Sequence, residues 1–186
     1  MHLAPRERLL ASSFELFSQY GFHATGVDTI LSHSKVAKAT LYRHFPSKEA
    51  LIVAVLEKRS AELHKAVAQV IDRSKLNAEE KVYRLFDYYK ERIRAESYIG
   101  CIFIKATLEY GKASSPVHCA AVAHKQAMAE YIHTLVSDCV DVDESPLSMQ
   151  LLVLLNGATV SAQIHKDSNS FEAAKAVARR LLRHCM

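Results

Sequence analysis

Polar side chains that bind phosphates and base edges gather within seven residues of this 186-residue chain. They supply an ammonium, a hydroxyl, a phenol, a guanidinium and an imidazole, and one small residue lies among them. The set is Lys38, Ala39, Thr40, Tyr42, Arg43 and His44. Such groups hydrogen-bond to phosphate oxygens and to bases in the major groove of DNA. The cluster therefore indicates contact with duplex DNA.

A short helix must hold this cluster in place. Leu41 and Phe45 are four residues apart, so they lie on one face of a helix and pin it to a core. A helix of two turns is unstable alone and needs that packing. The polar residues are then held outward on the opposite face. This arrangement is typical of the second helix of a helix-turn-helix.

Two further helices are predicted upstream of this one. The first covers residues 8–20 and ends at Gly21, a common C-terminal cap. The second begins at Thr25, which with Asp28 resembles a capping box. The turn that follows should bury Val36. Two helices joined by so few residues cross steeply, which completes a three-helix head.

The stretch from about Leu9 to Leu56 resembles the N-terminal domain of the TetR family of bacterial transcriptional repressors. The residues at the family's spacing are Leu41, Tyr42, Phe45, Lys48 and Leu51, together with Phe17, Gly21 and Phe22. The resemblance implies an all-α homodimer that binds a palindromic operator in double-stranded DNA. It also implies a C-terminal region that carries a small-molecule effector pocket and the dimer interface.

The resemblance assigns DNA contacts residue by residue. Tyr42, His44 and Lys48 match positions that contact phosphates, whereas Lys38, Thr40 and Arg43 are expected at base edges or flanking phosphates. Thr25, Lys35 and Ala39 complete the expected set.

The sequence departs from the family pattern at the turn. Lys35 stands where glycine is frequent, so the turn must be strained or different. Ala37 stands where serine or threonine would cap the next helix, at a cost of about 1 kcal/mol.

Composition limits the remaining classes of protein. Apolar residues make up 49% of the chain, enough for a sizeable core, and the net charge is only +4. DNA binding must therefore depend on where the charges lie. The longest apolar runs are too short to span a bilayer, and no signal peptide is visible. The four cysteines show no disulfide framework. We expect a cytoplasmic protein that does not bind membranes.

Helix breakers and caps divide the rest of the chain into about six more helices, giving about nine in all; the expected caps include Ser47 and the pair Asn77 and Glu80. The expected division is a helix-turn-helix domain over residues 1–47, a connecting helix over 48–71, and an effector-binding and dimerisation domain over 72–186. Nothing alternates with period two for long, so strands are not expected.

The last two helices carry small and aliphatic residues at helical spacing, which favours a four-helix dimer interface. The alternative is packing within one subunit. The predicted interface residues are Leu151, Leu155, Ala158, Ala162, Ala174, Ala178 and Leu181.

The resemblance places an effector pocket among the fifth to eighth helices. The candidates are Phe86, Tyr89, Ile93, Cys101, Phe103, Thr107, Tyr110, Met128, Asn156, Thr159 and Gln163. Each has a plain core interpretation as well. Cys101 begins a helix, where the dipole favours a thiolate, so a sensor of electrophiles or oxidants is one hypothesis. Glu109 either meets a cationic effector or pairs with Lys105.

The sequence also bears on a metal site, on an enzyme and on two other kinds of helical protein. His118 and His124 are six residues apart, which does not suit a helical metal site, so neither metal nor cofactor is expected. The chain has no nucleophile elbow or phosphate loop, so an enzyme is not expected. A TetR-like activator and a helical scaffold whose head does not read DNA remain the alternatives.

Overall fold

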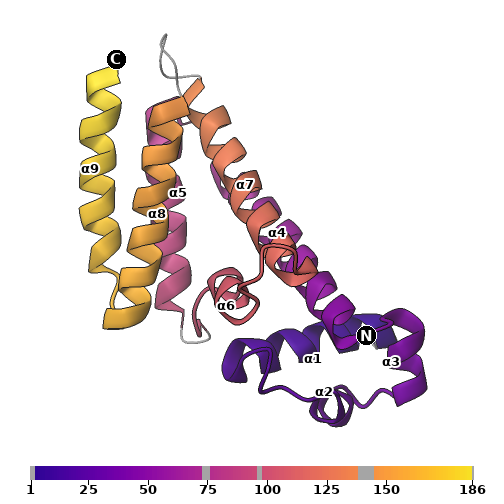
Figure 1. Cartoon of the computed structure of the whole chain (residues 1–186). Helices are drawn as coiled ribbons and strands as arrows, with labels where there is room; N and C mark the ends of the chain where they lie inside the picture. Colours follow the sequence, from indigo (N-terminus) through magenta and orange to yellow (C-terminus); the bar gives the residue numbers. More distant parts are fainter. Residues whose placement is uncertain (1–2, 73–75, 96–97, 138–144, 186) are drawn as a thin grey trace. The chain divides into compact units, whose positions relative to one another are not determined.

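The computed structural model describes residues 3–72, 76–95, 98–137 and 145–185, and these are helical throughout apart from short connections (Figure 1). The expected all-α fold is confirmed. The helices of the described residues are α1 (Pro5–Tyr20), α2 (Val27–Ser34), α3 (Lys38–His44), α4 (Lys48–Asp72), α5 (Ala78–Arg94), α6 (Ile102–Glu109), α7 (Pro116–Ser137), α8 (Ser145–His165) and α9 (Asn169–Cys185).

The chain forms two compact units. Unit 1 combines residues up to Glu62 with Cys101–His124, and unit 2 combines Leu63–Gly100 with the residues from Lys125 onward. The long helices α4 and α7 therefore contribute to both units. This division differs from the expected domain boundaries because α6 and the first part of α7 cluster with the N-terminal helices.

Unit 1 has a core of large side chains from α1 to α4. Phe17 and Phe22 are fully buried, with ring centroids 5.0 Å apart. Leu41 and Phe45 are 0% and 4% exposed, so the predicted anchors of the short helix are confirmed. Val36 is 6% exposed and fills the turn before it, also as predicted.

Unit 2 is built mainly from α5, α8 and α9, which pack side by side (Figure 1). Phe86 of α5 and Phe171 of α9 are each 1% exposed. Ion pairs reinforce the packing of α5 on α9, since Lys175 Nζ lies 2.6 Å from Asp87 Oδ1 and Lys90 pairs with Glu172. The aromatic face of Tyr83 also lies 5.0 Å from the Arg179 guanidinium.

Two of the predicted caps form and one does not. Asn77 and Glu80 make a complete capping box at the start of α5. Ser47 Oγ accepts the backbone N–H of Ala50 at 3.0 Å at the start of α4. Thr25 is wrong as a cap, because the N-cap of α2 is Gly26 and the Thr25 hydroxyl donates backwards to the Gly21 carbonyl at 2.7 Å.

Helix α8 is the one helix of the described ranges that is long and apolar enough to cross a membrane, judged by length and composition alone. Its apolar window, residues 146–165, is 44% buried inside the structure. A core helix of a soluble protein passes the same test. The apolar character of α8 is therefore divided between a core face and an exposed face.

Candidate DNA-contact surface and effector region

The short helix α3 presents its polar residues to solvent, as the sequence indicates. Lys38, Tyr42, Arg43 and His44 are exposed, and Thr40 is half-buried. Ala39 lies exposed among them. Helix α3 is attached to the core from its opposite side. The result is a solvent-exposed face with cationic, hydroxyl and phenol groups and no acid of its own.

Thr25 does not belong to this surface. Its side chain is 2% exposed, and its hydroxyl is used by the Gly21 and Leu16 carbonyls. The expected DNA contact from this side chain is therefore wrong, because a buried hydroxyl bonded to the backbone cannot reach a phosphate. It instead closes the α1–α2 turn from within.

The turn between α2 and α3 contains a residue in the left-handed backbone conformation, and this residue is not glycine. Lys35 has φ 52° and ψ 42°, the left-handed conformation that glycine adopts at no cost. The Arg8 guanidinium donates to its carbonyl at 2.9 Å. Ala37 is the N-cap residue of α3, and because its side chain is a methyl group it accepts no hydrogen bond from the helix backbone. Lys35 is exposed, so its ammonium remains available to DNA.

Lys48 occupies the first turn of α4, next to the end of α3. Its side chain is half-buried, and burial lowers the pKa of the ammonium. The Glu109 carboxylate opposes that shift. A cation beside the amino end of a long helix is a suitable group for a phosphate.

Glu109 makes contacts that the sequence did not indicate. Within the described residues it does not pair with Lys105. Its carboxylate accepts the backbone N–H groups of Phe22 and His23, at 3.0 and 2.7 Å. Lys105 Nζ donates to the Ser18 carbonyl at 2.5 Å. The end of α6 is therefore bonded to the end of α1 and to the α1–α2 turn.

The expected effector residues are divided between the two units. Cys101, Phe103, Thr107 and Tyr110 belong to unit 1, and the others belong to unit 2. Several are ordinary core or locally bonded groups: Phe86, Phe103, Met128 and Thr159 are buried, Tyr89 packs against Tyr88, Thr107 donates to the Ile104 carbonyl and Asn156 accepts from Lys125. Tyr110 stacks on His23 with ring centroids 4.7 Å apart. Its ring therefore packs against the α1–α2 turn.

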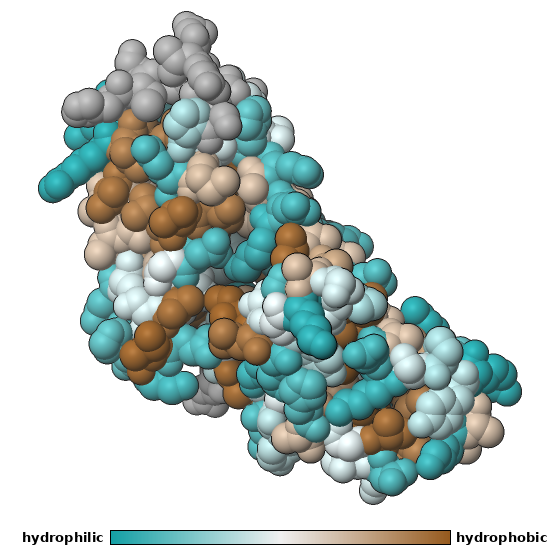
Figure 2. Space-filling model, viewed as in Figure 1, coloured by the Kyte–Doolittle hydropathy of each residue, from teal (hydrophilic) through white to brown (hydrophobic). Residues whose placement is uncertain are grey.

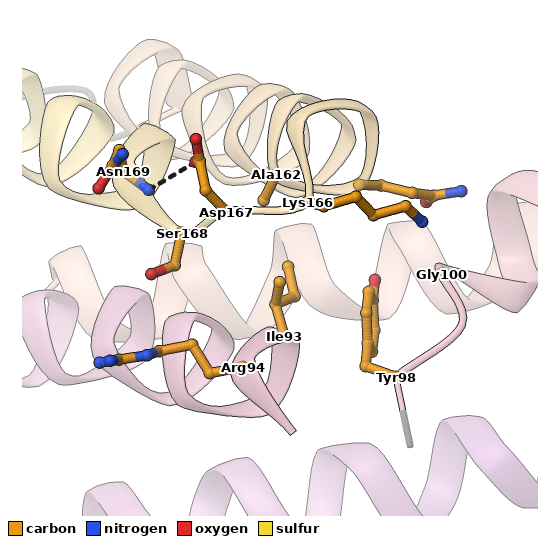
Figure 3. Close-up of a pocket in the computed structure, with 10 residues that line it drawn as sticks. Ile93, Arg94, Tyr98, Gly100, Ala162, Lys166, Asp167, Ser168 and Asn169 are labelled. Carbon is orange, nitrogen blue, oxygen red and sulfur yellow. Dashed lines mark hydrogen bonds between the residues drawn. The ribbon is translucent and has the colours of Figure 1, made fainter. Parts of the chain in front are cut away.

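Ile93 and Gln163 do line a cavity, of about 370 Å³, within unit 2 (Figure 3). The cavity lies between the end of α5, the segment at Tyr98–Gly100 and the α8–α9 turn. Tyr98 points from below toward the Lys166 side of the cavity in Figure 3. The remaining lining residues are Arg94, Ala162, Lys166, Asp167, Ser168 and Asn169. Volumes of this order accommodate small-molecule ligands.

Cys101 is the N-cap of α6 and is partly exposed. Neither Cys101 nor Cys119 forms a disulfide within the described residues. Cys139 lies outside the described residues.

Most of the residues expected at a dimer interface are buried within this subunit. Leu151, Leu155, Ala158, Ala162, Ala174 and Ala178 are at most 7% exposed, and Leu181 is intermediate. The buried side chains cannot line a surface for a second copy, so the choice of residues is corrected. The same helices expose a different apolar set: Met149, Val153, Val160 and Ile164 of α8 and Val177 of α9. Figure 2 shows apolar side chains gathered over the part of unit 2 where α8 runs.

The fold and this surface define a helix-turn-helix DNA-binding regulator. Residues 9–55 match the family model described as bacterial regulatory proteins, tetR family. The structure of SCO4454, a TetR-family transcriptional regulator from Streptomyces coelicolor, is similar with a TM-score of 0.90 and 29% identity, over 97% of this chain and 95% of that chain. Residues 9–55 are thus those of a tetR-family regulatory protein, and the whole chain has the fold of a TetR-family transcriptional regulator.

Two Escherichia coli regulators are similar over nearly their whole length. The transcriptional repressor NemR is 25% identical over 188 residues, covering 95% of this chain and 93% of NemR. The reduced form of NemR has a TM-score of 0.86 to this structure, over 95% of both chains. The regulator YjdC is 23% identical over 178 residues, covering 96% of this chain and 93% of YjdC.

Proposed function

We propose that this protein is a homodimeric cytoplasmic repressor that binds a palindromic operator and is released by a small-molecule effector. The observation that carries the proposal is the exposed polar face of α3, held rigidly by Leu41 and Phe45. An exposed helix face of this composition, placed by a helix-turn-helix, suits the major groove. The match of residues 9–55 to a family of bacterial regulatory proteins supports the same conclusion.

The first experiment is selection of bound duplexes from a random pool, followed by footprinting at defined salt. We expect an inverted repeat with half-sites about one helical turn apart, because a two-fold dimer presents two equivalent heads. Tyr42→Ala should weaken binding to all selected sequences, whereas Thr40→Ala should change which sequences are selected. Absence of any selected sequence would contradict DNA reading, and a single unrepeated half-site would contradict the dimer.

We propose that the dimer forms through the exposed apolar residues of α8. Ile164 is 68% exposed and Val153 is 61% exposed, and they belong to an open groove of about 520 Å³ on this helix. Isolated side chains of this size gain about 1.5–3 kcal/mol when they are fully buried. A second copy of this surface would bury the whole row.

Sedimentation velocity tests this surface. Ile164→Asp should convert the dimer to monomer at micromolar concentration and abolish cooperative binding to the inverted repeat. Leu108→Asp is the matched control, because Leu108 is 78% exposed but lies on α6. A dimer that survives Ile164→Asp, or that is lost equally in the control, would contradict the proposed interface.

We propose the cavity of unit 2 as the effector site, with the Cys101 thiol as the alternative point of response. A screen by thermal shift distinguishes them. A reversible ligand of the cavity should stabilise the wild type and act less on Gln163→Ala. A thiol-reactive effector should release DNA from the wild type and leave Cys101→Ser bound. An effector that acts equally on all three proteins would contradict both sites.

A further inference from the structure

The turn between α1 and α2 is held by a carboxylate from far along the chain. Phe22 and His23 are the first residues after the Gly21 cap of α1, and their N–H groups have no partner in α1. Both donate to Glu109, at 3.0 Å to Oε1 and 2.7 Å to Oε2. Hydrogen bonds to an ionised group are about twice as strong as neutral ones. The carboxylate therefore satisfies two donors that would otherwise need water.

The same two partners are joined by further contacts. The His23 ring nitrogen Nε2 lies 2.9 Å from the Glu109 carbonyl oxygen. The Tyr110 ring stacks on His23 at 4.7 Å and meets Phe22 edge-on at 6.1 Å. Lys105, one turn earlier on α6, donates to the Ser18 carbonyl. Helix α6 thus contacts the end of α1 through Lys105 and the turn itself through Glu109, each with a charged group.

The backbone conformation of the turn and its closeness to Glu109 both favour glycine at residue 21. Gly21 has φ 92°, and a Cβ atom built there would lie 2.8 Å from Glu109 Oε1. A carboxylate end could normally swing away from such an atom. Here it is fixed by two backbone donors, so the close approach requires glycine. The α1–α2 turn and Glu109 are fitted to each other.

The segment immediately before α6 lines the cavity of unit 2. Tyr98 and Gly100 line that cavity, and α6 begins at Ile102. Gly100 has φ 115°, and a Cβ atom there would lie 2.7 Å from the Gln163 amide nitrogen. The backbone therefore passes close to a side chain of α8 immediately before it enters α6. Only Cys101 separates Gly100, which lines the cavity, from the first residue of α6.

We propose that Glu109 is the positioning residue that ties the helix-turn-helix to α6, so that DNA binding and the state of α6 are coupled. The inference rests on the proposed DNA-binding function and names how that function is controlled. Glu109 is bonded to the backbone of the turn and lies outside the exposed face of α3. It holds the turn on which the positions of α2 and α3 depend. Coupling of this kind is reciprocal, so DNA must change α6 as much as α6 changes DNA affinity.

Hydrogen exchange of the full-length protein tests this without an identified effector. The probe is the duplex that the wild type selects from a random pool. In Glu109→Gln one acceptor and the charge are lost, so the Phe22 and His23 amides should exchange about tenfold faster or more. In the wild type, DNA should increase protection over residues 102–109. In Glu109→Gln, DNA should still bind, and protection there should not change.

Glu57→Gln is the matched control, because Glu57 is an exposed carboxylate on α4 within the same unit. It should respond to DNA as the wild type does. Unchanged exchange at Phe22 and His23 in Glu109→Gln, or a DNA response of α6 equal to that of the wild type, would overturn the proposal. If no duplex is selected, the repressor proposal fails, and the exchange rates of the free proteins still decide the role of Glu109.

Glu109→Gln could also destabilise the whole head, and exchange at Leu51 and Leu56 in the α4 core reports this. Glu109→Asp then replaces it as the test variant. It keeps the charge but shortens the side chain by one methylene, so the carboxylate cannot keep both bonds to Phe22 and His23 at their present lengths. The DNA response of residues 102–109 should fall by at least half. A full response in this variant, with the core intact, would overturn the proposal in the same way.

Discussion

Replacing Lys35 with glycine should stabilise the protein and weaken its binding to DNA. Lys35 is held at φ 52°, where a side chain costs about 1–2 kcal/mol. Glycine removes that cost but gains unfolded-state entropy of about 0.4–1 kcal/mol. The net gain lies between about 0 and 1.6 kcal/mol, with a central value of about 0.8 kcal/mol, which corresponds to a rise in Tm of about 2–3 °C for a chain of this size. The Arg8 bond to the carbonyl of residue 35 is kept in the variant.

Thermal and urea unfolding measure the change in stability. Two control variants separate the effect of backbone strain from that of losing the ammonium. Lys166→Gly changes the other described lysine with positive φ, at 56° in the α8–α9 turn, and should give a similar gain in unit 2. Lys35→Ala removes the ammonium but keeps the strain, so its Tm should stay near that of the wild type. A lower Tm for Lys35→Gly would refute the assignment of strain to this turn.

DNA binding measures the second term. If the Lys35 ammonium contacts a phosphate, Lys35→Gly and Lys35→Ala should lose the same affinity. Each should also reduce the slope of log K against log salt by about 1. Stability and affinity then move in opposite directions in one variant. An unchanged salt slope in both variants would remove Lys35 from the DNA-contact set and leave the strain argument intact.

Three further predictions follow from single contacts. Burial and a hydrogen bond to Glu79 raise the pKa of Tyr83 to about 12. The contribution of Tyr83 to stability is therefore complete below pH 10 and is lost as pH rises toward 12. Absorbance titration should show one phenol that ionises near pH 12 in the wild type and is missing in Tyr83→Phe. The hydrogen bond from Lys58 lowers the pKa of the Glu7 carboxyl below its ordinary 4.5. The stability that this contact contributes above pH 4.5 is therefore lost as the pH falls and the carboxylate is protonated. In Glu7→Gln the free energy of unfolding should fall less steeply between neutral and acidic pH. Asn77→Ala removes the capping box of α5 and should cost about 1 kcal/mol in urea unfolding, and a cost near zero would contradict the cap.

The features that the sequence predicted correctly depend on neighbours in the chain. Leu41 and Phe45 share a helix face because they are four residues apart, and they are buried for that reason. Asn77 and Glu80 form their capping box because both partners lie within one turn. Local spacing is enough in such cases, since the geometry of one helix turn relates the residues.

The same reasoning fails where several faces of a helix are apolar. Helix α8 carries apolar residues on its core side, such as Leu151 and Leu155, and on its exposed side, such as Val153 and Ile164. The helical period identifies both rows but does not say which one meets the rest of the subunit. That choice depends on α5 and α9, whose packing is not visible in the sequence of α8. The predicted interface residues therefore belong mainly to the row that this subunit buries.

The contacts of Glu109 could not be predicted from its neighbours in the sequence. Its hydrogen-bond partners, Phe22 and His23, are 87 and 86 residues away in the chain. The nearest sequence partner, Lys105, suggested an i, i+4 pair, and both side chains instead reach α1 and its turn. A charged pair on one helix and two separate bonds to another element have the same sequence pattern. Only the fold distinguishes them.

The two turns of the head show why one tolerates a side chain and the other does not. Lys35 and Gly21 both have positive φ, so both positions favour glycine on backbone grounds. Lys35 is exposed and meets no obstacle, so its cost is limited to the strain of the backbone. Gly21 is also confronted by Glu109, and Gly21→Ala must add a collision with a fixed carboxylate to the same strain. Alanine at residue 21 should therefore cost more stability than the strain alone. Part of that excess should disappear in the double variant Gly21→Ala, Glu109→Ala, because the obstacle is then gone.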